Sequence, residues 1–169
     1  LLYKQINKLD PKLVVKKLKQ FLKEDMPAGD ATTVSVVLKD TKEVFAIQAR
    51  ESMIFCGNPI IENIFSSKVK IKTMAKDGQK LLSGETIALV SGSNSEILTK
   101  ERLLLNMIQR MSGVSSLTRK YVEKLNNNKI KVLDTRKTTP GLRIFEKYAV
   151  FCGGGSNHRL NLSCGIMVK

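Results

Sequence analysis

The sequence D-T-R-K-T-T-P-G-L-R-I-F-E-K-Y-A-V-F-C-G-G-G-S-N-H-R, at residues 134–159, combines a dense group of cations with three consecutive glycines. Its cationic or ionisable side chains are Arg136, Lys137, Arg143, Lys147, His158 and Arg159. The apolar run Ile130 to Leu133, directly before it, predicts a buried strand. In α/β folds, the loops that leave the carboxyl ends of strands build the active site. Because Arg and Lys bind carboxylate and phosphate, the pattern indicates an anion site, with a solvated basic loop as the alternative.

Two motifs in this stretch resemble those of one enzyme family. D-T-R-K-T-T-P-G-L-R and E-K-Y-A-V-x-C-G-G-G-x-N-H-R are similar to motifs of the quinolinate phosphoribosyltransferases, also called carboxylating nicotinate-nucleotide pyrophosphorylases. The resemblance extends to residues 101–114 and 24–33, so it covers nearly the whole chain. It implies an enzyme of de novo NAD biosynthesis that joins quinolinate to 5-phosphoribosyl 1-pyrophosphate. The products would be nicotinate mononucleotide, pyrophosphate and carbon dioxide.

The resemblance also implies roles for individual residues. Arg136 and Arg159 would clamp the quinolinate carboxylates, with Thr135 beside them. Three further residues would line the same pocket and reach the phosphoribosyl donor: Lys137, His158 and Lys169. Lys137 and Lys169 would be the catalytic residues among them.

Arg102 would reach into the active site of a neighbouring subunit, which implies at least a homodimer. The alternative is a helix-surface arginine paired with an acidic residue four positions away. Mg²⁺ would enter with phosphoribosyl pyrophosphate, and we expect no metal ligand within these 169 residues.

Other groups in the central stretch are open to simpler interpretations. Arg143 and Lys147 are predicted to be helix-start and helix-surface groups, not ligands. The glycines at 153–155 fit either a phosphate-binding nest or close backbone packing. Cys152 is predicted to be a small buried side chain, with a nucleophile near His158 as the alternative.

Composition limits the classes of function. The chain has 29 Lys and Arg against 15 Asp and Glu, a net charge of +14, but the cations are spread widely and there is no Trp. Nucleic acid is therefore not the expected partner, because stacking platforms need aromatic side chains. No apolar run approaches a membrane span, and no signal peptide pattern opens the chain. Three cysteines without a CxxC pair favour a reducing cytoplasm over a disulfide framework or a zinc site.

Residues 1–102 predict an α+β sandwich domain with a mostly antiparallel sheet. Asp10-Pro11 is typical of a helix start, and apolar spacing continues the helix to about residue 23. Asp25 and Asp30 could hold a metal, although a capped turn is the preferred interpretation. The predicted strands and short helix follow in order: strands at 33–38, 44–50 and 53–56, a helix after Gly57, a strand at 69–73, and a further strand and a return within 81–90.

Residues 103–169 predict the first part of an incomplete parallel α/β barrel. A polar linker at 91–95 leads to a helix capped by Ser95, which Ser112-Gly113 interrupts before a second helix at 114–125. A strand at 130–133, a helix at 143–151 and a strand at 165–169 complete the pattern. Two strands cannot close a barrel, so we expect the native protein to continue. The resemblance implies that this piece alone is inactive, because the acidic residues associated with Mg²⁺ and the loops that hold the donor's 5′-phosphate would lie beyond residue 169.

Two other functions remain as alternatives. One is a paralogous pyrophosphorylase-like protein of molybdate-transport operons, which shares parts of the T-R-K and G-G-G motifs. The intact E-K-Y-A-V and S-N-H-R contexts favour the quinolinate enzyme. The other is a non-catalytic basic module that binds RNA or DNA, for which binding would weaken steeply with salt.

Overall fold

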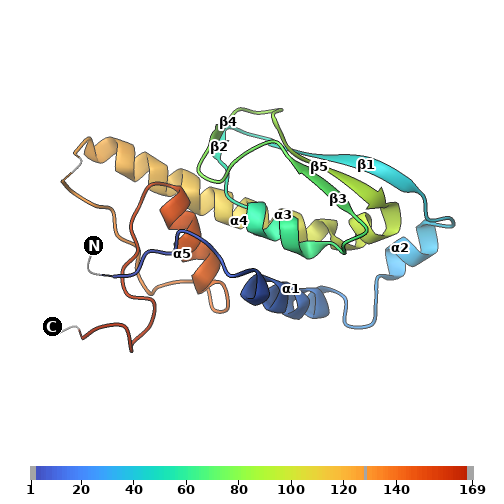
Figure 1. The fold of residues 1–169 in the computed structure, drawn as a ribbon, viewed down its shortest axis with the longest axis horizontal. Helices are drawn as coiled ribbons and strands as arrows, with labels where there is room; N and C mark the ends of the chain where they lie inside the picture. The colour runs from blue at the N-terminus through green and yellow to red at the C-terminus, as the bar shows by residue number, and fades with distance from the viewer. Residues whose placement is uncertain (1–2, 128, 167–169) are drawn as a thin grey trace.

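The computed structural model describes residues 3–127 and 129–166 of the chain (Figure 1). A long helix, α4, lies at the centre, with the strands and α3 on one side and α5 crossing its C-terminal half. The elements follow in chain order: α1 (Pro11–Asp25), α2 (Ala31–Val36), β1 (Lys42–Gln48), β2 (Met53–Ile54), α3 (Asn58–Ile64), β3 (Lys70–Thr73), β4 (Lys80–Leu81), β5 (Thr86–Ser93), α4 (Asn94–Leu125) and α5 (Arg143–Cys152). None of the helices in the described part of the chain has the length and apolarity that a membrane crossing requires.

The strands form two antiparallel sheets, which confirms the predicted mostly antiparallel arrangement. One sheet has the order β1-β5-β3, and the other pairs β2 with β4. β5 is the central strand, and its Val90 lies opposite Phe45 of β1 and Ile71 of β3. The predicted start of α1 is also confirmed, since the Asp10 side chain accepts a hydrogen bond from the Lys12 amide at 3.0 Å.

Helix α4 is continuous over 32 residues, so the predicted linker at 91–95 and the interruption at Ser112-Gly113 are wrong. β5 runs directly into α4, and Ser93, not Ser95, is the N-cap, because its hydroxyl accepts from the Glu96 amide at 3.1 Å. Gly113 costs about 1 kcal/mol within a helix. The packing of buried Ser112, which accepts from the Cys56 amide at 3.1 Å, offsets that cost. The predicted domain boundary at 102/103 falls inside α4.

Residues 33–38 do not form the predicted strand. Ala31–Val36 is a helix instead, capped by Asp30, whose carboxylate accepts from the amide and the hydroxyl of Thr33. This local capping outweighs the β propensity of a Val- and Thr-rich run. The interpretation of Asp30 as the cap of a turn is therefore confirmed.

In the C-terminal part of the chain, the structure confirms one predicted element and contradicts another. The helix predicted at 143–151 is α5. The strand at 130–133 is wrong, because its described backbone makes one isolated parallel bridge, and Ile130 and Leu133 are 53% and 47% exposed. A buried strand needs partners along its length. Gly165 and Ile166 are exposed and irregular, and the rest of the strand predicted at 165–169 lies outside the described residues. The partial barrel stays a prediction.

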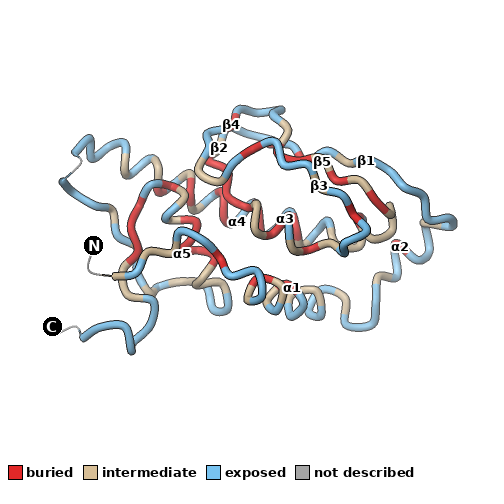
Figure 2. Tube along the Cα trace, viewed as in Figure 1, coloured by how far each residue is buried: buried red, intermediate tan, exposed pale blue. Residues whose placement is uncertain are grey.

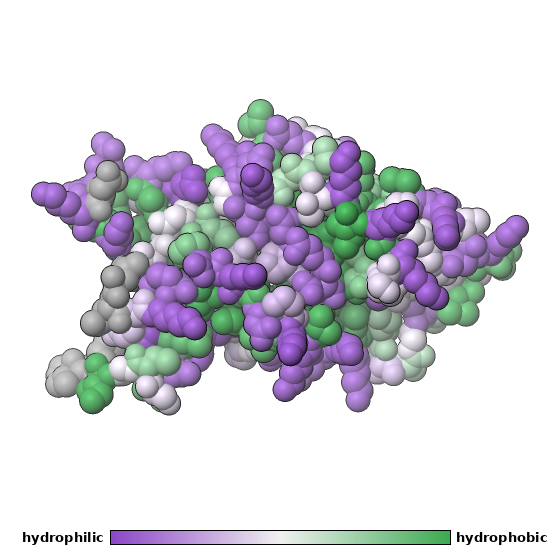
Figure 3. Space-filling view, viewed as in Figure 1, coloured by the Kyte–Doolittle hydropathy of each residue, from purple (hydrophilic) through white to green (hydrophobic). Residues whose placement is uncertain are grey.

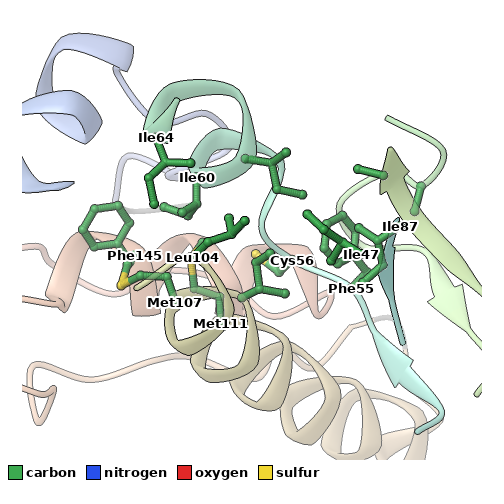
Figure 4. Packing of buried hydrophobic residues seen from close by; sticks show 14 of the residues in the cluster. Ile47, Phe55, Cys56, Ile60, Ile64, Ile87, Leu104, Met107, Met111 and Phe145 are labelled. Carbon is green, nitrogen blue, oxygen red and sulfur yellow. The ribbon is translucent and has the colours of Figure 1, made fainter. Parts of the chain in front are cut away.

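One hydrophobic core joins both predicted domains. In Figure 4, Ile60 and Ile64 of α3 face Leu104 and Met107 of α4, and Phe145 of α5 lies beside them. Figure 2 shows buried segments along α4, α3 and α5 and also in the strands, including β5. Hydrophilic side chains are spread widely over the face in Figure 3, with hydrophobic patches between them.

Candidate anion-binding site

A short parallel pairing brings the two cationic loops together. The Ser156 amide donates to the carbonyl of Val132 at 2.8 Å, and the Asp134 amide donates to the carbonyl of Ser156 at 3.0 Å. Residues 135–137 and 158–159 therefore leave from adjacent points of the backbone. The structure thus brings together the loops that carry five of the seven site residues predicted from the sequence.

A buried ion pair fixes these loops to α5. The Lys147 ammonium lies 2.5 Å from Asp134 Oδ1 and donates to the His158 carbonyl at 3.0 Å. The other oxygen of Asp134 accepts from the Asn157 side chain at 2.7 Å. Lys147 is 0% exposed, so its predicted place on the helix surface is wrong. It lies between core residues Phe145 and Ala149, and the carboxylate of Asp134 offsets the cost of burying its charge.

Hydrogen bonds within the first loop shape it into a tight turn. Thr135 Oγ1 accepts from the Lys137 amide at 3.0 Å, and the Thr138 amide donates to the Arg136 carbonyl at 3.0 Å. Arg143 Nε donates to Thr138 Oγ1 at 3.1 Å, at the first residue of α5, so its predicted role as a helix-start group is confirmed. Thr135 and Lys137 remain exposed on the turn.

The far end of this loop is anchored to α4 by an interaction that sequence reasoning missed. Arg110 lies 2.6 Å from Glu146 Oε1, and the Thr139 amide donates to Glu146 Oε2 at 3.1 Å. Burial raises the pKa of Glu146, but hydrogen bonds from Arg110 and Thr139 outweigh it and lower the pKa overall. An acidic residue beside Phe145 on an otherwise apolar helix face is the only sequence signal for this anchor.

The lowered pKa of Glu146 predicts an acid-dependent loss of stability. A carboxyl with a depressed folded-state pKa stabilises the fold above its unfolded pKa, and this contribution disappears as the pH falls through the lower value. We expect Glu146→Gln to cost about 1 kcal/mol at pH 7 and progressively less below about pH 4.5. The measurement is the melting temperature of the full-length protein from pH 7 to pH 3 at constant ionic strength.

Glu62→Gln is the matched control, because Glu62 is exposed on α3 and makes no side-chain hydrogen bond among the described residues. Its melting temperature should follow that of the wild type at every pH. If Glu146→Gln also follows the wild type at every pH, Glu146 does not anchor the loop.

The two arginines predicted to bind carboxylates each retain an unused donor. Nε of Arg136 and Nε of Arg159 are buried and have no hydrogen-bond partner among the described residues. Arg159 is oriented by a 2.7 Å bond from Nη1 to the Gly165 carbonyl. The ring of His158 packs against Tyr3, with centroids 4.6 Å apart. Lys169 lies outside the described residues.

Arg102 is exposed on α4, away from these loops. It lines a groove of about 710 Å³ between α4 and the α1–α2 region, together with Asp30, Leu98 and Leu105. It lies eight positions from Arg110 along the helix, an axial distance of about 12 Å. The alternative of a paired surface arginine is wrong, since Leu98 and Asn106 stand four positions away and no described acidic residue forms an ion pair with Arg102.

The glycines after α5 make close backbone contacts. A Cβ on Gly153 would lie 2.5 Å from the Ser115 carbonyl oxygen, and one on Gly155 would lie 2.7 Å from Val150 Cγ1. Arg119 Nε donates to the Gly153 carbonyl at 3.0 Å, which further joins α4 to this turn. Close packing is therefore the confirmed interpretation for Gly153 and Gly155.

A second polar cluster lies beneath α5. Single ligand atoms of Cys56, Asp77 and Cys152 lie within 4.8 Å of one another. Asp77 already accepts from the Gly57 and Asn58 amides and from the Tyr148 hydroxyl at 2.6 Å, and burial raises the pKa of the Cys56 thiol. Two sulfur ligands do not suit Mg²⁺, which binds oxygen ligands. Cys152 is partly buried and packs against the core beside this cluster, so its predicted burial is confirmed only in part.

Comparison with known proteins gives matches along most of the chain. The family model of the quinolinate phosphoribosyl transferase N-terminal domain matches residues 30–112, and that of the C-terminal domain matches residues 114–169. A probable carboxylating nicotinate-nucleotide pyrophosphorylase of Bacillus subtilis (strain 168) is 45% identical over 157 residues, covering 91% of this chain and 54% of the relative. A carboxylating nicotinate-nucleotide pyrophosphorylase of Mycobacterium leprae (strain TN) is 34% identical over 158 residues, covering 90% and 56%.

Comparison with solved structures gives matches to the same family of enzymes. The nicotinate-nucleotide pyrophosphorylase from Francisella tularensis has a TM-score of 0.87 and 38% identity, covering 94% of this chain and 57% of that one. NadC from Streptococcus pyogenes has a TM-score of 0.87 and 40% identity, covering 92% and 57%. The chain spans about half the length of the curated relatives it matches. Because the matched regions include both cationic loops and α4, the chain belongs to the quinolinate phosphoribosyltransferase family.

Proposed function

We propose that the protein containing this chain joins quinolinate to phosphoribosyl pyrophosphate and releases carbon dioxide, forming nicotinate mononucleotide in NAD biosynthesis. The observation that carries the proposal is the pair of arginines, Arg136 and Arg159. They lie on loops joined by backbone hydrogen bonds, and each retains a buried, unused Nε–H. Quinolinate has two carboxylates on adjacent ring carbons, and a guanidinium binds a carboxylate through parallel hydrogen bonds.

The chemistry requires alignment more than acid–base catalysis. The ring nitrogen of quinolinate already has a lone pair, so no general base is needed to activate it. Clamping both carboxylates would hold that nitrogen toward the anomeric carbon of the donor, where positive charge develops as pyrophosphate leaves. The alkylated nitrogen is cationic and stabilises the electron pair that stays on the adjacent ring carbon when its carboxylate departs as carbon dioxide. A proton from solvent then adds to that carbon.

Lys137, His158 and Lys169 are proposed to serve the donor side of the same pocket. Lys137 is exposed on the turn beside Arg136, where its ammonium could neutralise phosphate oxygens. Mg²⁺ is proposed to enter bound to the donor. The one described cluster of potential metal ligands has the wrong chemistry for it, so no catalytic step is assigned to a metal held by these residues.

We propose that the active protein is at least a homodimer, in which Arg102 completes the neighbouring active site. Two observations support this: Arg102 is exposed beside a groove, and it lies about 12 Å along α4 from the residue that anchors the cationic loop. Exposed Leu98 and Leu105 provide apolar area at the rim of that groove. We also propose that the protein acts in the cytoplasm, since its three cysteines are unbridged.

The test is release of labelled carbon dioxide from carboxyl-labelled quinolinate by the full-length protein, with phosphoribosyl pyrophosphate and Mg²⁺. We expect release that depends on the donor and that stops when Arg136 and Arg159 are both replaced by Gln. Nicotinate, which lacks the second carboxylate, should give no carbon dioxide and serves as the substrate control.

Absence of release from folded full-length protein would overturn the proposed activity. Steeply salt-dependent binding of RNA or DNA that quinolinate does not compete with would then favour a basic nucleic-acid-binding module.

A further inference from the structure

We propose that Lys147 is a positioning residue that sets the separation of the two quinolinate-binding loops. Its ammonium bonds to the side chain of Asp134, at the root of the loop carrying Arg136. It also bonds to the carbonyl of His158, immediately before Arg159. One buried cation thus bridges the two loops. This inference rests on the proposed function, because the spacing matters for a ligand that both loops bind.

Further hydrogen bonds hold both Asp134 and Lys147 in place. Asp134 Oδ1 also accepts from the His158 amide at 2.8 Å, and Oδ2 accepts from Asn157 Nδ2 at 2.7 Å. The same Asn157 nitrogen donates to the Lys147 carbonyl at 2.8 Å. The side chains of Lys147 and Asp134 are 0% and 5% exposed, so water cannot easily substitute for a missing partner.

Helix α5, which carries this ammonium, is held in place by contacts with neighbouring elements. Tyr148 donates to Asp77 at 2.6 Å, and Ser115 of α4 donates to the Ala149 carbonyl at 2.7 Å. Phe145 packs into the common core. Core packing therefore fixes the position of Lys147, and the hydrogen bonds of Lys147 fix the positions of the two loops.

The N-terminal segment holds the second loop from its other side. The Ile6 amide donates to Asn157 Oδ1 at 2.7 Å, and Gln5 Oε1 accepts from the Asn157 amide at 2.7 Å. The Gln5 side-chain amide also donates to the Asn157 carbonyl at 3.1 Å. The loop carrying His158 and Arg159 is thus fastened on both sides, and loss of the Lys147 bridge would release it toward the N-terminal segment.

Replacing both Lys147 and Asp134 by neutral residues distinguishes a positioning role of Lys147 from a contribution to stability alone. Lys147→Met alone leaves the Asp134 carboxylate buried without its cation, so a large fall in melting temperature is expected. The double variant Lys147→Met/Asp134→Asn removes both charges and should recover most of that fall. It does not restore the bond to the His158 carbonyl, so the loop spacing should remain altered.

The experiment measures the melting temperature, the quinolinate dissociation constant by calorimetry, and kcat and KM for both substrates on the full-length protein. In both variants we expect the quinolinate dissociation constant to rise between about tenfold and a hundredfold. The KM for phosphoribosyl pyrophosphate should change much less. If the Met variants do not fold, Asp134→Asn alone keeps the side-chain size but removes the charge that holds the Lys147 ammonium between the loops. A smaller loss of affinity, again selective for quinolinate, is then expected.

Lys100→Met is the matched control, because Lys100 also forms an ion pair, with Glu96 at 2.7 Å, but on a partly exposed face of α4. It should leave quinolinate affinity unchanged. A double variant that regains both the melting temperature and wild-type quinolinate affinity would reduce Lys147 to a structural residue and overturn the inference. An inactive wild-type protein that does not bind quinolinate would instead overturn the proposed function, and this inference with it.

Discussion

Replacing Gly153 by alanine is expected to destabilise the protein by about 3 kcal/mol, which is the upper end of the usual range for overpacking. The added methyl would lie 2.5 Å from the Ser115 carbonyl oxygen and 2.7 Å from Thr118 Cβ. Its backbone φ of −71° suits alanine, so the cost comes from sterics alone. Because the obstacles are the backbone and a branched side chain of α4, relief requires α5 and α4 to separate.

Gly113→Ala is the matched control. It makes the same change on the same helix pair, but nothing lies within 4 Å of the added Cβ. Replacing a glycine within a helix should stabilise the protein by up to about 1 kcal/mol. Thermal and urea unfolding of the full-length variants should therefore shift in opposite directions. Equal shifts would show that α4 and α5 do not pack as closely as described.

Arg102→Gln is expected to lower kcat/KM by about a hundredfold or more, a typical cost of losing one charged group that stabilises the transition state. The melting temperature should change little, because Arg102 is exposed and forms no ion pair with a described residue. This separation of activity from stability is the first readout. The second asks whether the lost group belongs to the same subunit as the site.

Mixing two inactive variants answers that question. When Arg102→Gln and Arg136→Gln subunits are dissociated and reassembled together, about a quarter of the sites should combine an intact Arg102 with an intact Arg136 from the neighbour. Activity should therefore return to about a quarter of the wild-type value. No recovery, from subunits shown to have exchanged, would mean that Arg102 acts within its own chain. Mixing two different Arg136 variants is the control and should restore nothing.

Local sequence signals predicted the elements whose formation depends on near neighbours. Asp10-Pro11 at the start of α1, the alternation in β3 and the turn at Asp77-Gly78 all appear where expected. The N-cap of α4 was misplaced because several small polar residues compete between 91 and 95. The hydroxyl that caps α4 belongs to Ser93, the last residue of β5.

The candidate site shows a different limit. The arginines could be identified from the family motif, but the burial of Lys147 could not, because it depends on Asp134, which lies 13 residues away. A lysine inside an apolar helix face is usually assigned to solvent, and only the three-dimensional partner reverses that assignment. The Arg110–Glu146 anchor was missed for the same reason, since its partners lie 36 residues apart.

The unbroken α4 has a consequence for how such proteins can diverge. Its first half packs beside α3, and its second half contacts both β2 and α5, so residues on both sides of position 102 belong to one core. An exchange of sequence between two homologues at this position would join halves of one helix that had adapted to different surroundings. Leu104 and Met107 would then meet an α3 with which they had not coevolved. Recombination is therefore expected to be better tolerated outside the helix than at its middle.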